Sequence, residues 1–310
     1  MEGVTDPSFR GLVLEDNGPG TVGAACTEFM RVSQQPLPTE VLARELGAAP
    51  DPARAGGVKV GIQLMGNEPE LVAATAVRAA EAGAAFVDLN FGCPAPRVFQ
   101  HCAGSALLAD PPLLESMVRT TVDACPLPVT AKIRSGIEHD DDLEELARRV
   151  EGAGAALLSV HARLRTDRYS DPSDWRRLER VRAAVSLPLY GNGDADSPAN
   201  IARMFRETGV DGVMVGRGAM GNPWVFRDYA DLLAGRPTQQ PGRTEIVDWM
   251  RRYDERMQGG GATERQSLGR LKQSLKALVK SRLLPFDEQT RAETLRLQAV
   301  EDFLAAVTAG

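Results

Sequence analysis

VDLNFGCP, at residues 87–94, joins an apolar run to a turn that carries a cysteine. The run is typical of a strand buried in a parallel sheet, and Gly92 and Pro94 form the turn after it. Because the carboxyl ends of parallel strands share one edge of the sheet, polar groups there predict the rim of an active site. Five more segments share this design: GIQLMG (61–66), AKIRSG (131–136), LSVHAR (158–163), LYGNGD (189–194) and VMVGRG (213–218).

Strand-like runs alternate with helical patterns along most of the chain. Asp110, Ser197 and Asn222 directly precede a proline, and Asn67 stands two positions before Pro69, as at a helix start. This alternation predicts an α/β fold, a TIM (β/α)8 barrel. The strand-like runs lie near residues 22–26, 58–64, 85–90, 128–134, 156–161, 187–191 and 211–215.

These runs number seven, and a barrel needs eight strands. The opening MEGVTDPSFR reads as the loop and helix that follow a first strand. We therefore expect the first strand to be missing from this chain. We favour a start placed at an internal methionine, because an open barrel exposes two unpaired edges; a segment from elsewhere, such as the C-terminus, is the alternative.

After residue 235 the pattern changes to helices alone. GRPTQQPGR, at 235–243, is a polar connector. We expect a catalytic barrel over residues 1–235 and an all-helical domain over 236–310. Leucines at helical spacing follow the connector at Leu268, Leu271, Leu275, Leu278 and Leu283, and a second apolar stripe contains Leu295, Leu297, Val300, Phe303, Leu304 and Val307.

The composition limits the classes of function. With 310 residues and 43% apolar content, the chain can bury a barrel-sized core and a smaller appendage. Its net charge of −6 argues against a protein devoted to generic nucleic-acid binding. Residues 1–235 carry a net charge of −9 and residues 236–310 one of +3. An RNA-facing surface is therefore compatible with the C-terminal part.

Cysteine usage and hydropathy predict a cytoplasmic protein. Cys26, Cys93, Cys102 and Cys125 form no close CxxC pair, and no signal peptide precedes them. The longest apolar runs are strand-sized, so we expect no membrane span. We expect no metal site and infer no obligate protein partner.

Three strand-end side chains are candidates for chemistry. Cys93 can give or take a proton at the barrel mouth, although an isolated cysteine is often a small buried hydrophobe. Lys132 and Arg134 point to one side of their strand and Ile133 to the other. Lys132 offers a cation for an electron-rich ring or a phosphate, and a snorkelling structural lysine is the alternative. His161 is expected to be a hydrogen-bonding residue of the pocket.

Two glycine loops follow the last two strands. In TIM barrels, these loops commonly bind phosphate with backbone amides. Here they are GNGD (191–194) and GRGAMGNP (216–223), where Arg217 adds charge. Glycines that merely turn the chain are the alternative.

The chain resembles the tRNA-dihydrouridine synthase family. The matching motifs occur in order over essentially the whole chain: MEGVTDPSFR, TEFMRVS (27–33), DLNFGCP, KIRSG, VHARLRTDRYSDPSDW (160–175), GNGD and VGRGAMGNPW. MEGV and TEFMRVS are most similar to the bacterial C subgroup, which acts on uridine 16. The resemblance implies an FMN-containing barrel with a helical domain that reduces uridine in tRNA with NADPH.

The resemblance also implies roles for single residues. Cys93 would protonate C5 of uracil while reduced FMN delivers hydride to C6, and Asn90 would line the uracil pocket. Arg97 stands where the family usually has lysine, and the loop at 101–104 is less glycine-rich than is typical. The residues expected to contact FMN are Met1, Glu2, Gln63, Lys132, His161, Asn192, Gly193, Asp194, Gly216 and Arg217.

RNA contacts are expected from the helical domain and from the segment after His161. Residues 265–282 contain six cations and no acidic residue, and lysines four apart form a stripe on one helix face. A solvated helix face is the alternative. The residues expected to bind substrate are Asn90, Arg134, Arg163, Arg165, Tyr169, Arg270, Lys272, Lys276 and Lys280.

Two other functions remain open from the sequence. An FMN barrel reductase of a small pyrimidine, of the dihydroorotate dehydrogenase type, would share the phosphate loops but need neither DLNFGCP nor a basic helical domain. A noncatalytic RNA-binding barrel would keep the basic stripe without needing Cys93, Lys132 and His161.

Overall fold

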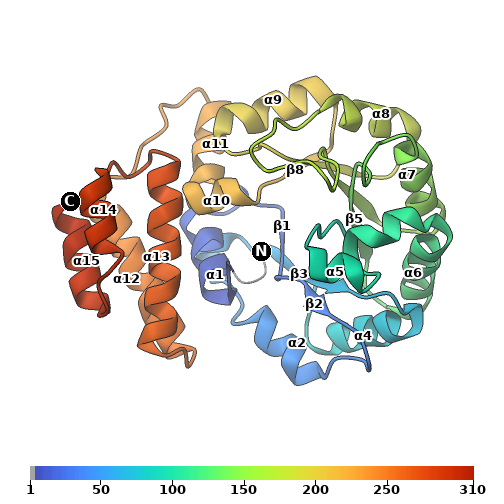
Figure 1. Ribbon diagram of the computed structural model, residues 1–310, viewed down its shortest axis with the longest axis horizontal. Helices are drawn as coiled ribbons and strands as arrows, with labels where there is room; N and C mark the ends of the chain where they lie inside the picture. The colour runs from blue at the N-terminus through green and yellow to red at the C-terminus, as the bar shows by residue number, and fades with distance from the viewer. Residues whose placement is uncertain (1–3) are drawn as a thin grey trace.

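The computed structural model describes residues 4–310. Its centre is a parallel sheet ringed by helices, with a helical bundle at one side (Figure 1). The strands are β1 (Ala24–Cys26), β2 (Met30–Arg31), β3 (Lys59–Met65), β4 (Val87–Phe91), β5 (Val129–Arg134), β6 (Leu157–His161), β7 (Leu189–Asn192) and β8 (Gly212–Met214).

The sheet is an open, TIM-like half-barrel. Its order is β1-β3-β4-β5-β6-β7-β8, with the short β2 beside β3. All seven predicted strands are present, and β2 is an additional strand that the sequence pattern did not indicate. Within residues 4–310, β8 and β1 form the two ends of this order and do not pair. The predicted parallel α/β fold is therefore confirmed, as a barrel that is not closed.

Helices cover the outer face of the sheet. Asp110 and Ser197 cap α6 and α9 as predicted. The prediction was wrong for Asn67, because α4 begins after Glu68 without a side-chain cap. Oδ1 of Asn222 accepts from the amide of Trp224 at 3.0 Å, just before α11. The helices of this part are α1 (Pro7–Asp16), α2 (Thr39–Leu46), α3 (Pro52–Ala55), α4 (Pro69–Glu81), α5 (Pro96–Gln100), α6 (Pro111–Ala124), α7 (Leu143–Gly152), α8 (Arg176–Ala184), α9 (Pro198–Thr208), α10 (Arg217–Gly221) and α11 (Val225–Leu233), with a 3-10 helix at Gly104–Ala109.

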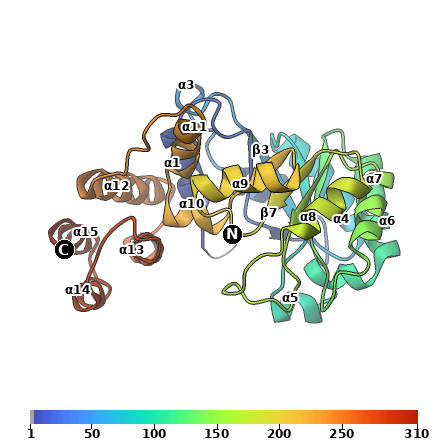
Figure 2. The same cartoon turned by 90° about the horizontal axis from the view of Figure 1, so that it is seen from above.

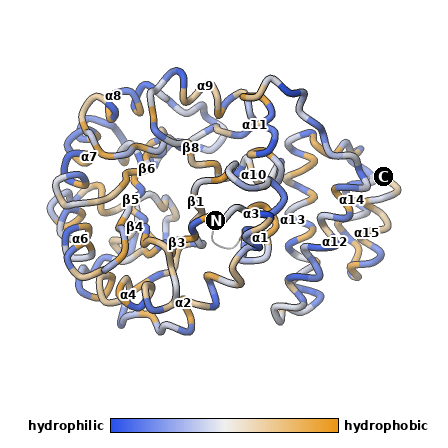
Figure 3. The backbone as a smooth tube through the Cα atoms, turned by 180° about the vertical axis from the view of Figure 1, so that it is seen from behind, coloured by the Kyte–Doolittle hydropathy of each residue, from blue (hydrophilic) through white to orange (hydrophobic). Residues whose placement is uncertain are grey.

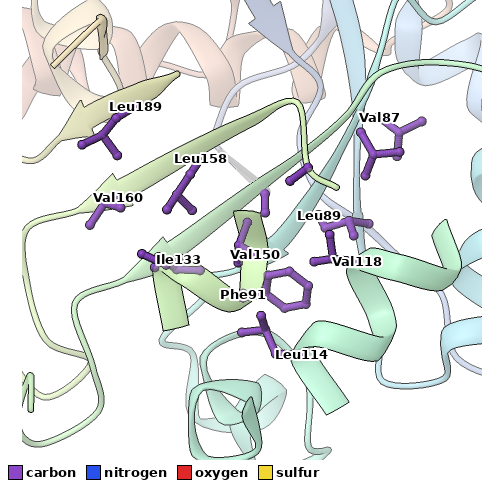
Figure 4. Packing of buried hydrophobic residues seen from close by; sticks show 14 of the residues in the cluster. Val87, Leu89, Phe91, Leu114, Val118, Ile133, Val150, Leu158, Val160 and Leu189 are labelled. Atoms are coloured by element: carbon purple, nitrogen blue, oxygen red, sulfur yellow. The ribbon is translucent and has the colours of Figure 1, made fainter. Parts of the chain in front are cut away.

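Alternation along the strands separates an apolar outer face from a polar inner face. Leu89 and Phe91 of β4 and Ile133 of β5 pack against Leu114 of α6 and Val150 of α7 (Figure 4). In Figure 3, a ring of helices encloses these strands. Because successive side chains of a strand point to opposite faces, the polar residues between them face the barrel interior.

The bundle consists of α12 (Arg243–Gly259), α13 (Glu264–Lys280), α14 (Glu288–Thr294) and α15 (Val300–Ala309). These four helices lie together beside α1 and α10 (Figure 2). Phe9 of α1 belongs to the bundle's apolar core and meets Trp249 and Tyr253 of α12 edge to face, with ring centroids 5.7 and 5.9 Å apart. The helical content predicted after residue 235 is therefore present, while α1 from the first part completes its core. A domain boundary at residue 235 stays a proposal.

Candidate active site

Polar side chains from four neighbouring strands lie side by side at one end of the sheet. The register pairs Asn90 of β4 with Lys132 of β5. It pairs Arg134 of β5 with His161 of β6, and His161 with Asn192 of β7. The structure thus brings together five residues that the sequence singled out.

Cys93 lies in the turn after β4, and Asn90 holds the backbone of that turn. The amides of Gly92 and Cys93 both donate to Oδ1 of Asn90 at 3.0 Å. The hydroxyl of Ser105 donates to the carbonyl oxygen of Cys93 at 2.7 Å. The side chain of Cys93 is partly exposed. These contacts fix the turn while the thiol stays accessible at the rim of the site.

The other cysteines are less suited to proton transfer in this site. Burial raises the pKa of the Cys26 and Cys125 thiols. Cys102 is exposed and adopts a φ of 50°, in the left-handed region. Cys93 is therefore the thiol whose position fits the predicted proton donor.

Behind Asn90, a chain of hydrogen bonds crosses the barrel interior. Nδ2 of Asn90 donates to Oε1 of Gln63 at 2.7 Å. Nε2 of Gln63 donates to Oδ2 of Asp88 at 2.7 Å, and the Thr130 hydroxyl donates to Oδ1 of Asp88 at 2.5 Å. Gln63 thus lies beside Asn90 as the predicted pocket requires.

Positive charge is concentrated at the strand ends. Burial holds the pKa of His161 far below its usual value, and the nearby charges of Lys132, Arg134, Arg163 and Arg217 lower it further. The imidazole is therefore neutral at pH 7. Burial lowers the pKa of Lys132 to about 8, and the charge of Arg134 acts in the same direction. Four cations around one neutral ring make a site suited to an anion.

Arg134, which the sequence predicts to bind substrate, directs its guanidinium to groups of the protein itself. Its side chain is 1% exposed. Nε donates to the carbonyl oxygen of Gly92 at 2.9 Å and Nη1 to that of Leu164 at 2.7 Å, while Nη2 donates to the Tyr169 hydroxyl at 3.3 Å. Arg134 therefore supports the turn before Cys93 from inside the barrel.

Arg163 and Asp194, which the sequence assigns to substrate and to cofactor, form an ion pair with each other. Arg163 is 1% exposed, and its Nη2 donates to both carboxylate oxygens of Asp194, at 2.6 and 2.8 Å. Burial acts to raise the pKa of Asp194, but the hydrogen bond and charge of Arg163 hold it below its usual value. Because this carboxylate is ionised and would repel a phosphate, Asp194 serves as counter-ion to Arg163. Arg163 in turn is not a surface contact for RNA.

Two glycines of the GNGD loop are required by packing. Gly193 has a φ of 117°, and a Cβ there would lie 2.4 Å from Oγ of Ser173 and 3.0 Å from Cδ2 of His161. A Cβ at Gly191 would lie 2.7 Å from Sδ of Met204 on α9. The alternative that glycines shape the chain thus accounts for both positions.

The loop after β8 is less closely packed than the GNGD loop. A Cβ at Gly216 would meet no atom within 4 Å. The guanidinium of Arg217 lies over the Tyr169 ring, 4.4 Å from its centroid, and Tyr169 stacks on His161 at 6.4 Å. Tyr169 is 52% exposed, so part of this aromatic side chain reaches solvent at the rim beside Arg217.

The remaining predicted RNA contacts have different surroundings. Arg165 lies over the Phe99 ring, 3.7 Å from its centroid. On α13, Lys276 and Lys280 are exposed, whereas Nζ of Lys272 donates to a backbone carbonyl between α14 and α15 at 2.5 Å. Only the latter part of the predicted lysine stripe is therefore presented to solvent.

Arg270 is separated from the other α13 cations by its contacts. Its Nε lies 3.4 Å from Oδ2 of Asp6. It also lines a cleft of about 350 Å3 together with Glu28, Phe29 and Arg31. The segment after β1 and the bundle thus meet at this cleft.

Asp88, Thr130 and Ser159 are interior polar residues that the sequence reasoning missed. Each stands two positions before a residue that it did select, namely Asn90, Lys132 and His161. Asp88 and Ser159 are 1% exposed, and Oγ of Ser159 has no hydrogen-bond partner among residues 4–310. Alternation within each strand was the available signal, because residues i and i+2 share a face.

The positions of Met1 and Glu2, both predicted to contact flavin, lie outside the described residues.

Comparison with known proteins identifies the family of the chain. The model of the family described as "Dihydrouridine synthase (Dus)" matches residues 1–306. The chain belongs to the dihydrouridine synthase family. It is therefore an enzyme of that family. Both alternative functions, the noncatalytic RNA-binding barrel and the reductase of a small pyrimidine, are excluded.

Curated relatives of two subgroups match the chain almost equally. A protein of Vibrio parahaemolyticus named "tRNA-dihydrouridine(16) synthase" is 39% identical over 249 residues, covering 75% of this chain and 76% of its own. One of Pseudomonas aeruginosa named "tRNA-dihydrouridine synthase B" is 35% identical over 234 residues, covering 75% and 68%. The family is thus shown, while membership of the C subgroup stays a proposal.

Solved structures support the fold. A Pseudomonas geniculata amine oxidase acting on 6-hydroxypseudooxynicotine has a TM-score of 0.53 and 17% identity, with 79% of this chain and 47% of that one covered. A 2-naphthoyl-CoA reductase complex has a TM-score of 0.55 and 12% identity, with 79% and 50% covered. Over the described residues, no group of histidine, cysteine and acidic side chains could hold a metal ion. No helix among them is long and apolar enough to cross a membrane.

Proposed function

We propose that this dihydrouridine synthase reduces uridine in tRNA to 5,6-dihydrouridine, with FMN as cofactor and NADPH as reductant. The observation that carries the proposal is the cluster of four cations around the neutral His161, next to the turn of Cys93. The relatives' names state tRNA as the molecule on which they act. FMN supplies hydride transfer when it is bound.

The residues present fit an anionic, planar cofactor. Asp194 faces both Arg163 and Arg217, and the charge of Asp88 acts on Lys132. Four cations thus meet two carboxylates, and the cluster keeps a surplus of positive charge. The open space beside Gly216 admits a ligand close to the backbone. Lys132, His161 and Gln63 would hold the ring system, with Asn192, Gly193, Gly216 and Arg217 around the ribityl phosphate.

The protein's own residues then have defined tasks. Since the pKa of Lys132 is about 8, most Lys132 side chains are charged at pH 7 and can stabilise negative charge on the ring. Asn90 fixes the turn that presents Cys93. Cys93 would hold the proton that passes to C5 of uracil on the face away from the ring.

The target base must leave its stack to reach this pocket. Tyr169, half-exposed beside His161, offers a face on which a base or nucleotide can stack. Lys276 and Lys280 on α13 offer cations for phosphates farther along the RNA. Uridine 16 is the proposed target, on the strength of the MEGV and TEFMRVS motifs and of the Vibrio relative.

A reduced cytoplasmic setting goes with this proposal, because tRNA is modified there and all four cysteines are free.

The decisive experiment compares Cys93→Ala with Cys102→Ala. Both proteins should purify with flavin absorbance. Because a general acid contributes about 10²–10⁴-fold, Cys93→Ala should lose that much of the NADPH-dependent formation of dihydrouridine in unmodified tRNA, and Cys102→Ala should keep the wild-type rate. Full activity in Cys93→Ala would refute the assignment of the proton donor. Mapping the modified position in the product tests uridine 16, and a colourless wild-type protein that takes up no FMN would refute the cofactor.

A further inference from the structure

Asp88 is a buried carboxylate whose partners give it an unusual place in the site. It is 1% exposed on the inner face of β4. Its oxygens accept one hydrogen bond from the Thr130 hydroxyl and one from the Gln63 amide. Among residues 4–310, no salt bridge to Asp88 is found. Burial raises the pKa of Asp88, while the two hydrogen bonds and the charge of Lys132 oppose this.

The hydrogen bonds between Asp88 and the Cys93 turn have a single consistent direction. The backbone amides of Gly92 and Cys93 can only donate, so the oxygen of Asn90 must face them. Its NH2 group must then face Gln63, which accepts with its oxygen. The NH2 group of Gln63 is left to donate, and the carboxylate of Asp88 accepts it.

Because the chain has this direction, the carboxylate of Asp88 controls how the side-chain amides of Gln63 and Asn90 are oriented. A side-chain amide can rotate by half a turn, which exchanges its donor and acceptor at almost no steric cost. At both Gln63 and Asn90, such a rotation would place two donors or two acceptors against each other. The Asp88 oxygen that accepts from Gln63 and the donor-only amides at the turn together exclude it.

We propose that Asp88 is a positioning residue, which through Gln63 and Asn90 fixes the orientation of the turn that carries Cys93. The proposal rests on the role of Cys93 as proton donor given above. Asp88 acts from the far side of Gln63 and Asn90, because its contacts are with Gln63 and Thr130.

The test is the isosteric variant Asp88→Asn, with Asp228→Asn as matched control. Asp228 on α11 is also a buried carboxylate that accepts from a side-chain amide, Nδ2 of Asn222, at 2.7 Å. Its position outside the sheet separates it from the Cys93 turn. Both variants replace one acceptor oxygen of a buried carboxylate by an NH2 donor. Asp228 differs in that it also faces Arg227 at 3.5 Å, and only Asp88 lies on the chain to Cys93.

Two readouts are measured on the flavin-loaded enzymes. For Asp88→Asn, kcat at saturating tRNA should fall by about 10–100-fold, the loss expected from misplacing a reacting group by about 1 Å, with KM for tRNA within about threefold. The rate at which iodoacetamide alkylates Cys93, followed by mass spectrometry of its peptide, should change by more than threefold. Asp228→Asn should match the wild type in both readouts.

Asp88→Ala provides a second variant with the acceptor removed altogether, and it should shift Cys93 alkylation in the same direction. Unchanged kcat and unchanged alkylation in Asp88→Asn would overturn the positioning role. A wild-type enzyme without activity on tRNA would instead overturn the proposed function. The alkylation measurement distinguishes the two failures, because it needs no tRNA.

Discussion

Removing the carboxylate of Asp194 should destabilise the protein even without any ligand. Arg163 is 1% exposed and Asp194 31% exposed, and they share two charge-assisted hydrogen bonds of 2.6 and 2.8 Å. Breaking a buried pair costs about 3–5 kcal/mol, because it leaves an uncompensated charge. Since Asp194 keeps some contact with water, the lower end applies, and we expect Asp194→Ala to lose about 3 kcal/mol.

That loss converts to a measurable shift in Tm. The unfolding entropy is about 2.1 cal/mol/K per residue, so about 3 kcal/mol in a chain of 310 residues lowers Tm by about 5 °C. The assay is thermal unfolding of flavin-free protein, followed by circular dichroism. Glu207→Ala is the control, since its i,i+4 pair with Arg203 is exposed at both partners and its loss should leave Tm almost unchanged.

The pH dependence has a definite sign. Because the pKa of Asp194 is lowered in the folded protein, its contribution is fully present above the unfolded value of about 3.9. It is lost as pH falls through the lower folded pKa. The difference in Tm between wild type and Asp194→Ala should therefore be largest near pH 7 and vanish in strong acid. A variant with wild-type Tm and weaker FMN binding would refute our reassignment and restore Asp194 as a direct contact of the cofactor.

Two further outcomes are expected from the bundle. Phe9→Ala should lower the free energy of unfolding by about 3–5 kcal/mol, because the buried Phe9 ring meets Trp249 and Tyr253. Urea unfolding followed by tryptophan fluorescence measures this loss. A loss below about 1 kcal/mol would show that α1 does not complete the core of the bundle. The double charge reversal Lys276→Glu with Lys280→Glu should weaken tRNA binding and leave flavin content unchanged. The slope of log Kd against log salt concentration should fall by about one unit per lysine. Filter binding at several salt concentrations checks this, and an unchanged slope would show that α13 does not contact the RNA.

Local patterns predicted most of the architecture. Apolar runs, capping residues and prolines predicted seven strands and most of the helices between them, because period and capping depend on residues close in sequence. The same alternation placed Asn90, Lys132 and His161 at strand ends. In parallel strands these ends lie at one edge, so the residues had to meet. Cys93 in its Gly-Pro turn followed from the same reasoning.

Long-range pairing decided what the charged residues do. The sequence could not show that Arg163 meets Asp194, which lies 31 positions later, and both were therefore assigned to ligands. Nor could it show that Phe9 would pack on Trp249 in a bundle that begins more than two hundred residues later. Burial and partner choice are properties of the folded chain, because water competes for every charge that the fold leaves exposed.

The sequence by itself determined a parallel α/β barrel fold followed by helices, and which strand ends carry polar groups; the open half-barrel came from the structure. Tertiary structure alone decided that Asp88 lies at one end of a directed hydrogen-bond chain that reaches Cys93 through two other strand residues. The physical reason is the difference in range: propensity and periodicity act within about one turn or a few strand residues, whereas hydrogen-bond direction is set by partners that only the folded barrel brings within 3 Å.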